Sequence, residues 1–313
     1  MAGQDGGAGS GEWWVDFAED GSGERHTFFL CGLKPAPLHL EPLKPVAPKK
    51  HLGQHFLHDQ SIAARIVGAL TLPGETRQVL EVGPGMGVLT QFLVKDERFE
   101  TTVVDIDTES IAWLRVHYPE LEGRIVEADF LRFDLGRALP GPVAVIGNFP
   151  YNISSQIFFH LLNYRGQVTE VVGMLQREVA ERLAAPAGSR ESGILSVLLQ
   201  AYYSVELLFR VGAGAFTPPP KVESAVIRCV RNGREKLACD ERKFVQVVKQ
   251  AFATRRKTLR NALKPLGLPA ELLGDPLLDK RAEQLGVEDF ERLTRMVEGG
   301  GEGGGEGELK INN

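Results

Sequence analysis

The residues best suited to do chemistry form a corner at 148–151, where Asn, Phe, Pro and Tyr follow an apolar run. The Asn148 amide oxygen and the Phe149 carbonyl can both accept hydrogen bonds, and an exocyclic amino group has two hydrogens to donate. Pro150 fixes the turn and cannot donate, and Tyr151 offers a face for stacking a purine. The corner predicts methylation of an amino group by in-line displacement, in which positioning supplies most of the rate. The alternative is an Asx turn ahead of a helix.

A glycine-rich loop at 83–87 (GPGMG) follows an apolar run that ends in Glu81 and Val82. Glycines in a strand-to-helix turn let the backbone approach a ligand closely and aim helix N–H groups at it. The dinucleotide fingerprint GxGxxG would need a third glycine where this chain has Val88. The loop therefore predicts a nucleoside-bearing ligand without a pyrophosphate, and a tight turn that binds nothing is the alternative.

Two aspartates end the next two predicted strands. Asp105 follows Gly83 at the spacing of about 20 residues that suits a carboxylate bound to ribose hydroxyls. Asp129 lies where a side chain can reach a base amino group. Because open α/β sheets bind ligands outside the carboxyl ends of their strands, we expect the loop and both carboxylates in one site. Either aspartate could instead be a solvated helix cap.

The elements that position these residues follow from hydrophobic periodicity. Alternating strands and helices predict an α/β fold with a parallel sheet covered on both faces, and an all-helical pattern begins after Cys239. Strands are predicted at 78–82, 101–106, 124–128, 143–147, 170–175 and 225–230, and helices at 61–70, 88–94, 110–118, 154–162, 244–263 and 289–297.

The chain then divides into four parts. Residues 1–48 form an extension with a Pro-rich linker, and residues 298–313 form a Gly/Glu-rich tail; both compositions are typical of disordered chain. Between them lie an α/β domain at 49–233 and a helical domain at 238–297.

Composition excludes several classes of protein. The net charge of −5 rules out a globally basic nucleic-acid coat, and no apolar run approaches the roughly 20 residues that span a bilayer. The three cysteines, at 31, 229 and 239, form no CxxC pair, which favours reduced thiols in the cytoplasm. His51, His55 and His58 lack a thiolate cluster, so no metal is expected.

The stretch 242–264 carries eight Lys or Arg residues and no Asp or Glu. A solvated helix face normally mixes the two signs of charge, so this one-sided pattern in an acidic chain predicts contact with phosphates. An ordinary solvated surface is the alternative.

In combination, these features resemble the small-subunit ribosomal RNA adenine N6-dimethyltransferases of the bacterial KsgA/RsmA type, which are related to the Erm methylases. The resemblance covers residues 49–297. It rests on five segments in order: 49–57 (KKHLGQHFL), 81–87 (EVGPGMG), 148–154 (NFPYNIS), 216–222 (FTPPPKV) and 255–261 (RRKTLRN). It implies a Rossmann-like class I methyltransferase domain with a small helical domain after it, S-adenosylmethionine as methyl donor, and two adjacent adenosines near the 3′ end of small-subunit rRNA as acceptors.

The resemblance also implies roles for individual residues. The donor site would be lined by His55, Leu57, Gly83, Asp105, Asp129 and Asn148, and the corner Asn148, Phe149, Pro150 and Tyr151 would be catalytic. Phe216 would face Tyr151 across a flipped adenine, with a core anchor as its alternative. RNA contacts would come from Lys221, Arg255, Arg256, Lys257 and Arg260. Many relatives have Asn, Glu and Leu where this chain has His55, Asp105 and Phe149.

The expected partner is small-subunit rRNA within a pre-30S particle, bound by a monomer that needs no membrane. Three other functions stay open: an Erm-like enzyme of large-subunit rRNA, a non-catalytic subunit assembly factor, and a nicotinamide oxidoreductase. The 216–222 loop and helical C-terminus disfavour the first, the intact 148–151 corner disfavours the second, and Val88 disfavours the third.

Overall fold

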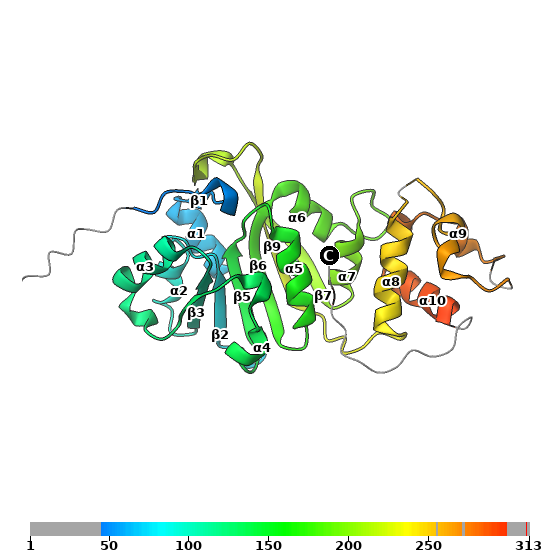
Figure 1. Cartoon of the computed structure of the whole chain (residues 1–313), viewed down its shortest axis with the longest axis horizontal. Helices are drawn as coiled ribbons and strands as arrows, with labels where there is room; N and C mark the ends of the chain where they lie inside the picture. The colour runs from blue at the N-terminus through cyan, green and yellow to red at the C-terminus, as the bar shows by residue number, and fades with distance from the viewer. Residues whose placement is uncertain (1–44, 255, 271–272, 299–310, 312–313) are drawn as a thin grey trace, which may run out of the picture. The chain divides into compact units, whose positions relative to one another are not determined.

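The computed structural model describes residues 45–254, 256–270, 273–298 and 311. Seven strands form one sheet in the order β4-β3-β2-β5-β6-β9-β7 (Figure 1). The strands are β2 (Gln78–Val82), β3 (Glu100–Asp105), β4 (Ile125–Glu127), β5 (Val143–Asn148), β6 (Val168–Gln176), β7 (Tyr203–Val211) and β9 (Ser224–Arg231). A separate ribbon pairs β1 (Phe56–Leu57) with β8 (Phe216–Thr217).

The prediction of a parallel sheet is confirmed for the first five strands and wrong for the last two. Strands β4, β3, β2, β5 and β6 pair in parallel, whereas β9 runs antiparallel to both β6 and β7. A parallel neighbour needs a long crossover, usually a helix. Residues 212–223 hold only a single 3-10 turn and the short strand β8, so β9 returns beside β7 in the opposite direction. Strand β7 itself was not predicted.

Helices cover both faces of the sheet. Alternate residues of β2 show this, because Val79 packs in a cluster with α1 and α2, and Leu80 packs in a cluster with α5. The helices of this part are α1 (Gln60–Gly68), α2 (Thr90–Leu93), α3 (Thr108–His117), α4 (Leu135–Ala138), α5 (Ser154–Asn163), α6 (Arg177–Ala184) and α7 (Ile194–Gln200). No helix in the described part of the chain has the length and apolar character to cross a membrane.

The C-terminal part is helical, but the predicted helix over 244–263 is interrupted. Helix α8 (Glu241–Phe252) ends six residues before α9 (Leu259–Ala262), and α10 (Val287–Glu298) packs against α8. Residues 253–258 offer no apolar side chain larger than alanine for a core-facing stripe. The chain therefore turns, and the Gln250 side-chain amide donates to the Ala262 carbonyl at 2.8 Å across the turn.

The two terminal segments fall mostly outside the described residues. Of the predicted disordered extension, residues 1–44 lie there, while Val46 is buried. Of the Gly/Glu-rich tail, Glu298 closes α10 and Ile311 is buried, with its N–H donating to the Asn163 side chain. The expectation of disorder is therefore wrong at Ile311, because an apolar side chain and a backbone acceptor are available to it.

Two glycines make room for the ring of Phe149, which follows β5. A Cβ at Gly147 or Gly173 would approach atoms of that ring to within 3.0 Å. The ring is 1% exposed and packs edge-on against Phe158. These glycines on β5 and β6 thus let a large side chain sit inside the sheet layer and hold the backbone of the corner in place.

We expect Gly173→Ala to lower the free energy of unfolding by about 1–3 kcal/mol, because the added methyl group overpacks the core against Phe149. Urea denaturation measures the change. The control is Gly166→Ala, since a Cβ there meets nothing within 4 Å. Equal stability of the two variants would contradict this account of the corner.

Candidate functional site

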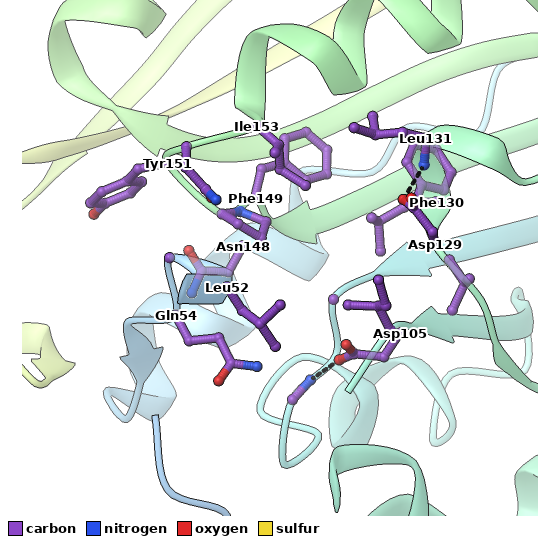
Figure 2. Close-up of a pocket in the computed structure, with 18 of the residues that line it drawn as sticks. Leu52, Gln54, Asp105, Asp129, Phe130, Leu131, Asn148, Phe149, Tyr151 and Ile153 are labelled. Carbon is purple, nitrogen blue, oxygen red and sulfur yellow. Dashed lines mark hydrogen bonds between the residues drawn. The ribbon is translucent and has the colours of Figure 1, made fainter. Parts of the chain in front are cut away.

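A cavity of about 240 Å³ opens at the carboxyl ends of β2, β3, β4 and β5 (Figure 2). All four residues of the 148–151 corner line it, and so do five of the six residues that the resemblance placed at the donor site: His55, Gly83, Asp105, Asp129 and Asn148. Leu57 is buried and lines an adjoining cavity of about 40 Å³, which Gly83 and Asn148 also line. The sequence therefore brought the predicted site together apart from one displaced member.

The glycine loop leaves the space that a ligand needs. Gly83 and Gly85 have φ of +69° and +55°, in the left-handed region that favours glycine. A Cβ on Gly83 would enter the cavity, because its nearest neighbour would be Pro150 Cδ at 4.0 Å. A side chain at this position would therefore fill the cradle in front of the loop.

Asp105 lies at the end of β3 with 7% exposure. It accepts hydrogen bonds from the N–H groups of Gly85 at 3.3 Å and Asp107 at 3.0 Å (Figure 2). Burial raises the pKa of Asp105 above its ordinary value. The two backbone donors fix the carboxylate at the edge of the cavity, in reach of a polar group placed there.

Asp129 proves to be both a cap and a cavity residue. It begins the 3-10 turn at 130–132 and accepts a hydrogen bond from the Leu131 N–H at 3.0 Å (Figure 2). Its side chain is 37% exposed, so it has acceptor capacity left. Apolar walls lie beside both aspartates, including Ile106, a large side chain that is 51% exposed.

The amide of Asn148 has a defined orientation. Its Nδ2 donates to the backbone carbonyl of His55 at 2.9 Å. The side-chain oxygen is then the end of the amide that remains for a ligand. Next to it, the Phe149 N–H donates to the Met174 carbonyl at 3.0 Å, which anchors the corner to β6.

The ring of Tyr151 is half-buried and makes two side-chain contacts. Its hydroxyl lies 2.5 Å from Ser224 Oγ, and its ring stacks with His55 at a centroid distance of 5.2 Å. Burial raises the pKa of Tyr151 above its ordinary value, so the phenol stays neutral near pH 7. Analysis of the sequence did not identify Ser224, which lies just beyond the 216–222 segment.

A strap at 49–55 also borders the cavity, and sequence reasoning assigned no role to its first contacts. Lys49 forms ion pairs with Asp107 and with Glu109, the latter at 3.1 Å. Gln54 Nε2 donates to Asp107 at 3.2 Å. The hydrogen bond to Asp107 raises the pKa of Lys49. Because Asp107 also caps α3, these contacts join the strap to the strand end that carries Asp105.

The predicted RNA contacts are placed less uniformly. Phe216 is 2% exposed, belongs to a core cluster and does not line the cavity. Lys221, Arg256 and Lys257 are exposed, Arg255 lies outside the described residues, and Arg260 pairs with Asp279 at 2.6 Å. The stacking role of Phe216 and the RNA contacts stay predictions.

Comparison with known proteins gives consistent matches. The profile of the family described as ribosomal RNA adenine dimethylase matches residues 47–295. The chain is 55% identical over 257 residues to ribosomal RNA small subunit methyltransferase A of Cytophaga hutchinsonii, covering 82% of this chain and 100% of that protein. It is also 55% identical to the protein of that name in Bacteroides thetaiotaomicron over 258 residues, covering 82% of this chain and 96% of the relative.

Two solved structures are similar in fold. A dimethyladenosine transferase from Plasmodium falciparum superposes with a TM-score of 0.65 at 24% identity, covering 78% of this chain and 97% of that one. The 23S rRNA methyltransferase ErmE superposes with a TM-score of 0.53 at 27% identity, covering 77% and 99%.

The buried carboxyl of Glu81 yields a prediction of pH dependence. Its side chain accepts a hydrogen bond from Thr90 at 2.6 Å, and burial raises its pKa from 4.5 to about 8. Between these values the folded protein keeps a proton that the unfolded chain has lost. The free energy of unfolding therefore falls as pH rises, by about 1.4 kcal/mol per pH unit.

Glu81→Gln removes the titration, so the stability of this variant relative to the wild type should rise steadily from pH 5 to pH 8. Urea denaturation at several pH values measures it. The control is Glu97→Gln at an exposed position. A Glu81→Gln difference that stays constant over this range would refute a buried neutral carboxyl.

Proposed function

The chain belongs to the ribosomal RNA adenine dimethylase family, and from this premise we propose that its cavity transfers methyl groups to N6 of two adjacent adenosines near the 3′ end of small-subunit rRNA. As a member of that family it uses S-adenosylmethionine as methyl donor. The observation that carries the assignment of the site is the orientation of Asn148. Its nitrogen is bound to the His55 carbonyl, so its oxygen is left to accept from an amino group.

The cavity fits the methyl donor. The open space before Gly83 admits a ligand against the backbone, Asp105 would accept from ribose hydroxyls, and Asp129 would accept from the adenine amino group. Exposed Ile106 supplies an apolar surface for the adenine ring. When bound, the donor supplies a methyl group on a positively charged sulfur, which is the electrophile of the reaction.

The corner orients the target nitrogen. Asn148 Oδ1 and the Phe149 carbonyl would accept its two hydrogens, which turns the lone pair of the nitrogen toward the methyl group. The adenine reaches this position only after leaving its stack, and Tyr151 offers a ring face for it. Each transfer forms a C–N bond and releases one proton from the nitrogen. The monomethylated amine keeps one hydrogen, so one acceptor can still orient it for the second transfer.

We place RNA docking on the C-terminal helices at 238–297. Arg256 and Lys257 are exposed at the turn between α8 and α9, where they can contact phosphates. In our proposal the substrate is the rRNA within a pre-30S particle, and the protein acts as a cytoplasmic monomer. The free thiols of Cys229 and Cys239 agree with a reducing compartment.

Asn148→Ala should lower the rate of rRNA methylation by roughly 100- to 1,000-fold, the range found when one preorganised hydrogen-bonding group is removed from an active site. Transfer of labelled methyl groups to small-subunit rRNA measures the rate, and calorimetry should show that donor binding persists. Asn232→Ala, which changes an asparagine outside the cavity, is the control. Near-normal methylation by Asn148→Ala would rule out the proposed role.

Replacing Arg256 and Lys257 together by alanine should weaken RNA binding and flatten its salt dependence by about one logarithmic unit per lost phosphate contact. Filter binding across a salt series measures both quantities. Arg77→Ala serves as the control, because Arg77 lies before β2 at the amino ends of the parallel strands. An unchanged salt slope in the double variant would contradict phosphate contact at this turn.

A further inference from the structure

The ring of Tyr151 is held by side chains from two distant segments of the chain. Its hydroxyl contacts Ser224 at 2.5 Å, across 73 positions of sequence. One face of the ring stacks with His55, with the ring planes 27° apart. A tyrosine that only filled space would not need both a hydroxyl partner and a stacking partner.

Ser224 is itself fixed in place. It is fully buried and is the first residue of β9. It pairs with Gln176 on β6 and with Val211 on β7, so the sheet holds its backbone from both sides. A hydroxyl on such a residue is a rigid point to which the phenol of Tyr151 can be bound.

His55 is fixed by the connection that leads into Ser224. Its Nδ1 lies 2.8 Å from the Pro218 carbonyl, and because a carbonyl only accepts, Nδ1 carries the hydrogen. His58, three residues on, bonds Thr217 Oγ1 at 3.1 Å. The segment 217–224 therefore braces Tyr151 twice, at the hydroxyl directly and at the ring face through His55.

We propose that Ser224, assisted by His55, is a positioning residue that sets the orientation of the Tyr151 ring for the target adenine; this rests on the function proposed above. A stacked base follows the tilt of the ring beneath it, and a small tilt moves N6 away from Asn148 Oδ1. Without the Ser224 hydroxyl the ring can turn, so fewer bound adenines present their nitrogen in line with the methyl group.

The test uses two substitutions that each delete one partner of the same hydrogen bond. Ser224→Ala and Tyr151→Phe should each lower kcat for small-subunit rRNA methylation by about 5- to 30-fold, the effect of one lost hydrogen bond. Because they remove the same bond, the double variant should lose no more than either single variant. KM for RNA should change less than twofold, and Ser224→Thr, which keeps a hydroxyl, should recover part of kcat.

The matched control is Ser204→Ala on the neighbouring strand β7, where the serine is exposed; it should leave kcat unchanged. Tyr151→Phe keeps the ring, so it reports on the hydrogen bond even if Ser224→Ala impairs folding, which thermal unfolding would reveal. Losses that multiply in the double variant, or wild-type kcat in folded Ser224→Ala and Tyr151→Phe, would overturn the positioning role while Asn148→Ala remained inactive. Absence of methyl transfer by the wild type would instead overturn the proposed function and this role with it.

Discussion

The hydrogen bond from the Asn148 side-chain nitrogen to the His55 carbonyl is the constraint on which the site depends. A primary amide has one donor end and one acceptor end, and only the acceptor end can orient an amino group whose lone pair must stay free. The strap that carries His55 is tied to the sheet through Lys49, Gln54 and Asp107. The segment that precedes the sheet thus determines the chemistry of a residue at the end of its central strand.

The rest of the fold holds that amide where a donor ligand and a flipped base can meet. Parallel strands bring the glycine loop, Asp105 and Asp129 to one edge of the sheet. The buried ring of Phe149 anchors the corner between Gly147 and Gly173. The antiparallel strand β9 then delivers Ser224 to Tyr151 from the other side. The parallel half of the sheet therefore serves the donor, and the antiparallel half serves the acceptor.

Much of this arrangement could be predicted from the sequence. Periodicity located 78–82 with its observed bounds, and the rule that ligands bind at strand carboxyl ends gathered Gly83, Asp105 and Asn148 correctly. Contacts between distant segments were beyond such reasoning. The strand β7 alternates poorly because it lies at an edge and is only partly buried, and Ser224 carries no local signal because its partner is 73 positions away. Phe216 fitted both a stacking and a core role, and sequence alone could not weigh its burial.

The most direct measurement is a crystal structure of the protein with S-adenosylhomocysteine and an RNA fragment that contains the target adenosines. The account predicts the adenine N6 at hydrogen-bonding distance from both Asn148 Oδ1 and the Phe149 carbonyl, with Asn148 Nδ2 still bound to the His55 carbonyl. An amide turned so that its nitrogen faces N6, or a target base bound away from the 148–151 corner, would contradict it.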